Sequence, residues 1–139
     1  MDNPYFVVDT NCFVSANLVA NSTSALCFDR ILSIGTIAMS DSIFAEYTEV
    51  IYRKKLDKYL KDSKRKAILS ALKKNAVFFN IIEQINSCED SKDNMFLELA
   101  IACSATCIVS GDFHLLSMNP FREIPILNAT DFLLSYQVN

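Results

Sequence analysis

Short apolar runs alternate with helical patterns along this chain, and this alternation is the feature that most constrains its fold. Tyr5–Asp9, Thr36–Met39 and Cys107–Val109 are short runs dominated by apolar residues, as strands buried on both faces are. A stretch with helical apolar spacing follows each of the first two runs and precedes the third. Strands that alternate with helices predict an α/β sandwich with a parallel sheet.

Capping residues and apolar spacing predict where the other elements lie. Gly35 is the expected C-cap of one helix, and Ser40 is the expected N-cap of the next. Pro125 cannot donate to a β-ladder, so the last strand is expected at a sheet edge. The first two expected helices are Asn11–Leu18 and Ser24–Ile34, and a third follows Ser40. A fourth follows Ser63, with Ile68, Ala71 and Leu72 facing inward, a fifth begins near Asp93, and a short last helix is capped by Asn128 or Thr130. Extended segments are expected at the start of Val77–Ile82 and over Ile124–Leu127.

The chain's 139 residues predict one domain, 1–139, and its composition excludes several kinds of site. Two glycines are too few for a phosphate-cradling loop or a dinucleotide fingerprint, and a single histidine excludes a paired-histidine zinc site. Five cysteines without a CxxC pair indicate neither a disulfide framework nor a zinc ribbon, and they suit a reducing cytoplasm. No apolar run approaches the ~18 residues of a membrane span, and no signal peptide is recognisable, so a cytoplasmic protein without membrane contact is expected.

Four acidic residues stand where the predicted sheet would bring them to one edge. Asp9 ends the first strand, and Asp112 follows the Cys107–Val109 strand. Glu46 lies early in one helix and Asp93 at the start of another. Parallel sheets bind ligands at the carboxyl ends of their strands. Crowded carboxylates raise one another's pKa values, and Mg²⁺ or Mn²⁺ would relieve that repulsion, so the acids predict a metal site suited to phosphoryl-transfer chemistry.

Each acid also has an ordinary structural interpretation. Asp93 could cap its helix, Asp112 could be a turn residue, and Glu46 could face solvent. Asp9 is the hardest to explain in this way, because an acid at the end of an apolar strand is disfavoured without a partner. His114 lies two residues past Asp112 and could touch a substrate phosphate, but a lone histidine in a loop is more often structural.

Basic residues are concentrated in one segment. Ten of the 13 lysines and arginines lie between positions 53 and 74, opposed there by only two acids, so this segment carries +8 and the other 117 residues carry −11. Such a run is commonly a solvated helix face, but it can also hold a phosphate backbone. For that role we expect Arg53 and Lys54, two turns past Glu46 on one helix, with Lys55 and Lys58 beside them.

Four segments, in order, resemble the acidic motifs of PIN domains. They span residues 7–11, 43–54, 88–100 and 108–116, and each contains one of the four acids among apolar residues. Residues 119–127 and 130–132 also resemble the VapC-like toxin branch of this family, and the whole resemblance covers residues 5–134. Two places depart from that branch: Ser91 stands where proline is frequent, and Phe113–His114 replace a charged pair. Neither departure removes a carboxylate.

The resemblance implies a three-layer α/β/α sandwich with about five parallel strands in the order 3-2-1-4-5. It also implies a metal-dependent endoribonuclease that hydrolyses RNA phosphodiester bonds, as the toxin of a toxin–antitoxin pair. Asn11 matches the polar residue that helps to position the first acid, and Ser110 matches the hydroxyl residue two before the last. The implied partners are RNA, an antitoxin chain in the groove near the site, and a second copy in a homodimer. The residues matching the family's catalytic acids, which would hold Mg²⁺ or Mn²⁺, are Asp9, Glu46, Asp93 and Asp112.

Two other functions remain open at this point. A PIN-type module could bind RNA or protein without cleaving it, because an intact quartet of acids does not by itself establish turnover. A phosphatase-type α/β enzyme would need a second aspartate two residues after Asp9, where this chain has Asn11. RNA cleavage with and without metal tests the first alternative, and phosphate release from a small phosphomonoester tests the second.

Overall fold

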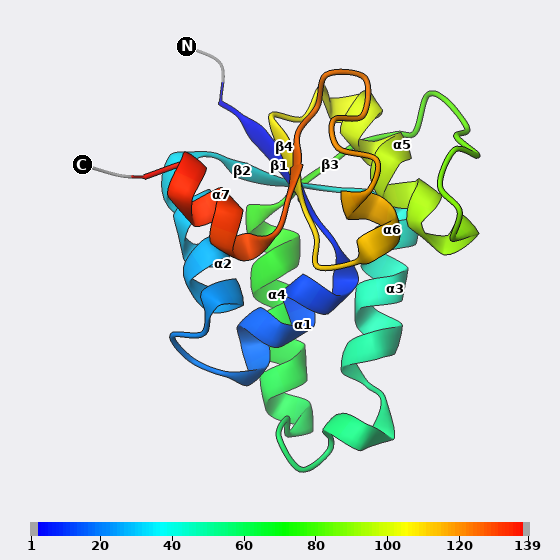
Figure 1. Ribbon diagram of the computed structural model, residues 1–139. Helices are drawn as coiled ribbons and strands as arrows, with labels where there is room; N and C mark the ends of the chain where they lie inside the picture. The colour runs from blue at the N-terminus through cyan, green and yellow to red at the C-terminus, as the bar shows by residue number, and fades with distance from the viewer. Residues whose placement is uncertain (1–2, 138–139) are drawn as a thin grey trace.

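The computed structural model describes residues 3–137, and these contain a parallel sheet of five strands (Figure 1). The strands lie in the order β3-β2-β1-β4-β5, so the expected order is confirmed and the first strand of the chain lies at the centre. Every neighbouring pair is parallel. The strands are β1 (Tyr5–Val8), β2 (Thr36–Met39), β3 (Val77–Phe78), β4 (Cys107–Val109) and β5 (Ile126–Leu127).

Helices cover both faces of this sheet, which is the expected α/β/α sandwich. The helices are α1 (Thr10–Leu18), α2 (Thr23–Ile34), α3 (Asp41–Ile51), α4 (Asp62–Asn75), α5 (Asn94–Cys103), α6 (Phe113–Leu116) and α7 (Ala129–Ser135), with the 3-10 helices η1 (Lys54–Leu56) and η2 (Ser91–Asp93). α2 and α7 pack together (Figure 1). Phe6 of β1 meets Phe132 of α7 edge-on, with ring centroids 5.5 Å apart. α5 packs against the central strands β1, β2 and β4.

The ends of β1 and β4 meet at one edge of the sheet. Val8 pairs with Val109, and the amide of Asp9 donates a hydrogen bond to the carbonyl of Val109 at 2.9 Å. Tyr47 of α3 is fully buried, and its hydroxyl donates to the carbonyl of Val8 at 2.5 Å. This bond ties α3 to the end of β1. The side chains that follow β1 and β4 therefore share one edge with the early turns of α3.

Helix α3 ends earlier than the sequence pattern predicts. It stops at Ile51, so the prediction that Arg53 and Lys54 lie on the helix of Glu46 is wrong. The physical reason is Arg65 of α4, whose buried guanidinium donates to the carbonyl of Ile51 at 2.7 Å and to that of Arg53 at 3.3 Å. These bonds satisfy carbonyls at the helix terminus, and the chain turns away there. Arg65 thus belongs to the interior and not to a solvated basic face.

Helix α4 also differs from the prediction, at its start and on one face. It begins at Asp62 and not after Ser63. Leu72 is buried and Ile68 packs against the core, as expected, but Ala71 is exposed. Ala71 lines a solvent-accessible cavity between α1, α2 and α4, and this accounts for its exposure.

Most of the remaining expected boundaries are confirmed. The side chain of Ser40 accepts from the amide of Ile43 at 3.3 Å, and Asn128, not Thr130, caps the last helix. The last strand is shorter than predicted, because Ile124 forms an isolated antiparallel bridge with Phe121 instead of joining the sheet.

The cysteines lie in the interior of the protein. All five cysteines are buried free thiols. Burial raises the pKa of Cys27 and of Cys107 to about 12, so both thiols stay protonated at neutral pH.

Within residues 3–137, no helix has both the length and the apolar character needed to cross a bilayer.

Gly35 is the C-cap of α2, as expected, but the need for glycine is steric. Its backbone is extended, with φ at −167°, a conformation open to any residue. A Cβ at this position would lie 2.4 Å from the carbonyl oxygen of Pro4 and 2.7 Å from Cε2 of Phe6. The absence of a side chain therefore lets the end of α2 pass close to the start of β1.

We expect Gly35→Ala to lower the free energy of unfolding by about 1–3 kcal/mol, because the backbone at Pro4 must move to admit a methyl group. Gly111→Ala is the matched control, since nothing lies within 4 Å of a Cβ built there. For that variant the change should stay below about 0.5 kcal/mol. Urea unfolding followed by circular dichroism measures both, and equal losses would contradict the steric explanation.

Candidate active site

The four predicted acids line one cleft at the carboxyl edge of the sheet. Asp9 follows β1, Asp112 follows β4, Glu46 lies on α3, and Asp93 precedes α5. The cleft has a volume of about 190 Å³. The other residues that line it are Thr10, Asn11, Val50, Arg53, Asp90, Lys92 and Phe96. Thr10, Asp90 and Lys92 are additions that sequence reasoning did not select.

Asp9 is the most buried of the four acids, with 4% of its surface exposed. Its Oδ1 accepts from the amide of Cys12 at 2.8 Å and so caps α1. Its Oδ2 accepts from the hydroxyl of Ser110 at 2.5 Å and from the amide of Gly111 at 3.2 Å. Burial raises the pKa of Asp9, and the three donors oppose that rise because they favour the anion.

Ser110 connects the first acid to the last. While its hydroxyl donates to Asp9, the same oxygen accepts from the amide of Asp112 at 2.9 Å. The residue is 1% exposed, so both bonds are shielded from water. The other residue predicted to support the site, Asn11, is exposed and lines the cleft, and within residues 3–137 its side chain forms no hydrogen bond with Asp9.

Asp93 and Asp112 form a coupled pair. Each precedes a helix without making the usual N-cap hydrogen bond, although the amides of His114 and Leu115 in α6 help to lower the pKa of Asp112. With both carboxyls ionised, Oδ2 of each would be buried without a partner among the described residues. Burial first, and then the hydrogen bond with Asp112, raises the pKa of Asp93 to about 8. The same hydrogen bond lowers the pKa of Asp112, so the two carboxyls share a single proton near neutral pH.

Glu46 approaches the cleft from the side of α3. The hydroxyl of Thr10, the first residue of α1, donates a hydrogen bond to its Oε2. This contact joins α1 to α3 directly beside Asp9. The fully buried ring of Tyr47 stacks on Phe13 with centroids 4.1 Å apart, which fixes the same two helices below the cleft.

The donor atoms of the cleft suit a hard divalent cation. They are carboxylate and hydroxyl oxygens, the ligands that Mg²⁺ and Mn²⁺ prefer, and the buried Oδ2 atoms of Asp93 and Asp112 have no other partner when ionised. The acids are nevertheless not a ready-made chelate. In the described part of the chain, no three or more histidine, cysteine or acidic residues are grouped closely enough to hold an ion as they stand.

Two cations lie at the cleft, and one of them was predicted. Arg53 lines it and pairs with Glu49 at 3.0 Å, an exposed ion pair of the kind that contributes at most about 1 kcal/mol. Lys92 of η2 lines it as well, and it lies outside the basic segment that the sequence emphasises. Lys54, Lys55 and Lys58, the other predicted contacts, are exposed on and just after η1 but do not line the cleft.

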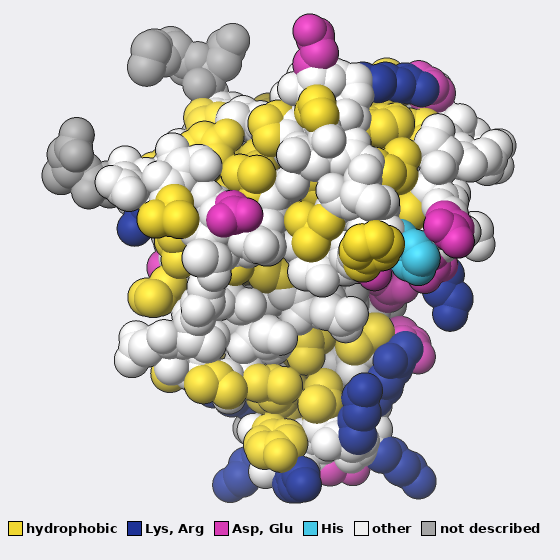
Figure 2. All heavy atoms as spheres, viewed as in Figure 1, with side chains coloured by type: hydrophobic (Ala, Val, Ile, Leu, Met, Phe, Trp, Pro, Cys, Tyr) yellow, Lys and Arg dark blue, Asp and Glu magenta, His cyan; other side chains and the backbone are white. Residues whose placement is uncertain are grey.

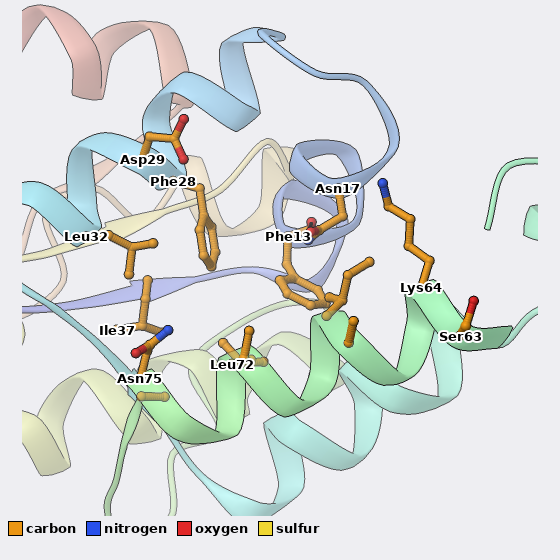
Figure 3. Close-up of a pocket in the computed structure, with 14 residues that line it drawn as sticks. Phe13, Asn17, Phe28, Asp29, Leu32, Ile37, Ser63, Lys64, Leu72 and Asn75 are labelled. Carbon is orange, nitrogen blue, oxygen red and sulfur yellow. Dashed lines mark hydrogen bonds between the residues drawn. The ribbon is translucent and has the colours of Figure 1, made fainter. Parts of the chain in front are cut away.

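The largest cavity described lies elsewhere. It has a volume of about 610 Å³ and is walled by α1, α2 and α4, with Phe13, Phe28 and Leu72 projecting into it (Figure 3). It shares no residue with the acidic cleft. Its lining is mostly apolar and contains one acid, Asp29, whereas the smaller cleft gathers the four predicted acids and is therefore the candidate active site.

Comparisons with known proteins agree with this architecture. The sequence profile of the family described as "PIN domain" matches residues 5–114, which include all four acids. The chain belongs to the PIN domain family. The PIN domain resemblance drawn from the four acidic motifs is thereby confirmed.

This PIN domain protein is similar to a curated protein in sequence and to a solved structure in fold. "Uncharacterized protein MJ1680" of Methanocaldococcus jannaschii is 33% identical over 114 residues, which are 81% of this chain and 73% of the relative. Among solved structures, "Crystal structure of VapBC2 from Rickettsia felis bound to a DNA fragment from their promoter" has a similar fold, with a TM-score of 0.60 and 15% identity over 89% of this chain and 98% of that chain.

We expect Ser110→Ala to destabilise this PIN domain protein by about 1–3 kcal/mol, because it leaves Asp9 Oδ2 short of a donor and the Asp112 amide without its acceptor. Ser117→Ala is the control, since that exposed hydroxyl donates only to the carbonyl of His114. Urea unfolding of both variants measures the difference. A Ser110→Ala protein as stable as Ser117→Ala would contradict the bridging role.

Proposed function

We propose that this protein is a metal-dependent endoribonuclease that hydrolyses RNA phosphodiester bonds. The observation that carries the proposal is the set of four carboxylates in one small cleft, two of which have buried oxygens without partners when ionised. Such oxygens favour a cation as their partner, because a buried anion without one is strongly destabilised. Membership of the PIN domain family supports the same chemistry.

In this mechanism the four acids divide the work of holding the cation. Asp9 would be the fixed ligand, since three hydrogen bonds hold its carboxylate in place. Asp93 and Asp112, whose Oδ2 atoms are buried without another partner when ionised, would supply further ligands in place of the proton that they share. Glu46, oriented by Thr10, would complete the set. When bound, Mg²⁺ or Mn²⁺ supplies Lewis acidity, which activates water and stabilises charge on the phosphate.

Basic side chains would bring the RNA to this acidic cleft. An uncompensated acidic cleft repels a phosphate backbone, so cations must flank it. Arg53 and Lys92 lie in the cleft lining, and Arg53 can exchange its exposed partner Glu49 for a phosphate. Lys54, Lys55 and Lys58 extend the positive surface beyond the cleft on the side of η1.

We further propose that the nuclease is the toxin of a toxin–antitoxin pair. The sequence resemblance to VapC-like toxins supports this, and the fold similarity to the VapBC2 structure agrees with it. The proposed partners are an antitoxin chain in the groove near the site and a second copy in a homodimer. Co-purification with the product of a neighbouring gene and light scattering test them. Five buried free thiols support a reducing cytoplasm as the location.

The alternative is a PIN domain that binds RNA or protein without cleaving it. RNA cleavage decides between them. We expect the wild type to cleave single-stranded RNA with Mn²⁺ and to lose this activity with EDTA. For Asp9→Asn we expect the cleavage rate to fall on the order of 100-fold (about 2.7 kcal/mol). Asp29→Asn is the control, because Asp29 lies on α2 beside the larger cavity and not in the cleft. Far-ultraviolet circular dichroism checks that each variant is folded. If the wild type and Asp9→Asn leave the RNA equally intact while metal is bound, the protein is instead a PIN domain that binds RNA or protein without cleaving it.

We expect Arg53→Ala to weaken RNA binding and to lower the slope of log affinity against log salt by about 0.7, the contribution of one phosphate contact on a single strand. Lys73→Ala is the control, because Lys73 lies in the last turn of α4, at the opposite end of that helix from η1. Fluorescence anisotropy in the Asp112→Asn background, which prevents cleavage, gives both slopes. Identical slopes for the two variants would remove Arg53 from the RNA-binding surface.

A further inference from the structure

A second hollow adjoins the acidic cleft on the side of α6. It has a volume of about 310 Å³ and shares Asn11 and Asp112 with the cleft. Its other lining residues are Cys12, Ser15, Ser24, Gly111, Phe113 and Ala129. None of these side chains is charged, so this hollow differs from the cleft beside it. A ligand that spans both would place a charged group at the acids and a neutral group in the hollow.

Phe113 forms one wall of this hollow and is unusually exposed. It is the first residue of α6, directly after Asp112, and 76% of its surface is accessible, the largest fraction among the exposed large apolar side chains of the described residues. Its ring lies edge-on to that of His114, with centroids 6.1 Å apart. In Figure 2 the single histidine marks this place: a large apolar side chain lies beside it, acidic side chains border it, and basic side chains continue down the same side.

The chemistry of the hollow matches a nucleobase. A base has two apolar faces and an edge of hydrogen-bond donors and acceptors, and proteins that hold single strands stack such faces on exposed aromatic rings. Phe113 offers the ring, while the amide of Asn11 and the hydroxyls of Ser15 and Ser24 offer hydrogen-bonding partners. The ring also follows directly in sequence the acid that faces the phosphate. One nucleotide can therefore reach the cleft with its phosphate and the hollow with its base.

We propose that this hollow is a base-binding subsite, in which Phe113 stacks on the base of the nucleotide next to the cleaved phosphate. The inference rests on the proposed RNA-cleaving function and adds where the strand runs: from Arg53 and Lys92, across the carboxylates, to Phe113. Phe113 acts by holding the substrate and takes no part in the bond cleavage.

The absence of tryptophan from the chain allows a direct test without turnover. Phe113→Trp introduces a single tryptophan at the subsite, and Leu134→Trp introduces one on α7, where Leu134 is 63% exposed and outside both hollows. A ten-nucleotide oligoadenylate is titrated into each variant with Ca²⁺ present. We expect saturable quenching of about twofold or more for Phe113→Trp and little change for Leu134→Trp, because base stacking quenches indole fluorescence. Equal or absent quenching in both variants overturns the subsite.

Cleavage kinetics provide a second and independent test. Stacking of one base is worth about 1–3 kcal/mol, so Phe113→Ala should raise KM roughly 5- to 150-fold with little change in kcat, and Phe113→Tyr should restore the wild-type KM. For an RNA that lacks the base at one position next to the mapped cleavage site, the wild type should have a higher KM than for the intact RNA. The KM of Phe113→Ala should not rise further with this RNA. A wild-type KM for Phe113→Ala overturns the inference and leaves the nuclease standing. If the wild type neither cleaves nor binds RNA, both the base-binding subsite and the proposed nuclease function are wrong.

Discussion

The buried carboxylate of Asp9 is the interaction on which the rest of the site depends. Three donors hold it: the amide of Cys12 at the start of α1, and the hydroxyl of Ser110 and the amide of Gly111 just after β4. One anion thus joins two neighbouring strand ends and a helix terminus. The hydrogen bonds favour the anion and so oppose the desolvation, which raises the pKa of the carboxyl. Through the second bond of Ser110 the same network reaches Asp112, so the position of the last acid follows from that of the first.

Charge is the second organising constraint, and folding divides the basic segment into parts with different roles. Arg65 is buried, where it binds two carbonyls, pairs with Asp57 at 3.1 Å and lies over the ring of Tyr52 at 5.3 Å. It ends α3 and so places Arg53 at the rim of the acidic cleft. The lysines of η1 and of the outer face of α4 are exposed. A run of like charge in the sequence is therefore one structural arginine, one cation at the cleft and a solvated remainder.

Much of the fold could be predicted because its signals are local. Apolar strands that end in a polar residue, and caps such as Ser40 and Asn128, depend on neighbours within a few positions. The differences arise where distant residues meet. The end of α3 depends on Arg65, fourteen positions beyond Ile51, and sequence spacing carries no sign of that contact. Thr10 directly follows Asp9 in the sequence, but its hydrogen bond to Glu46 joins residues thirty-six positions apart. Lys92 lies in the cleft lining but outside the basic segment, so no charge pattern indicated it.

The sequence alone determined the class of fold, the strand order through the family resemblance, and the four acids, because strand ends, caps and motifs are written in consecutive residues. Only the tertiary structure decided what each acid experiences. Burial and hydrogen bonds from two separate segments act on Asp9. Asp93 and Asp112 are nineteen positions apart in sequence but share one proton in space. Those quantities depend on solvent exclusion and on distances between segments, which arise only when the chain is packed.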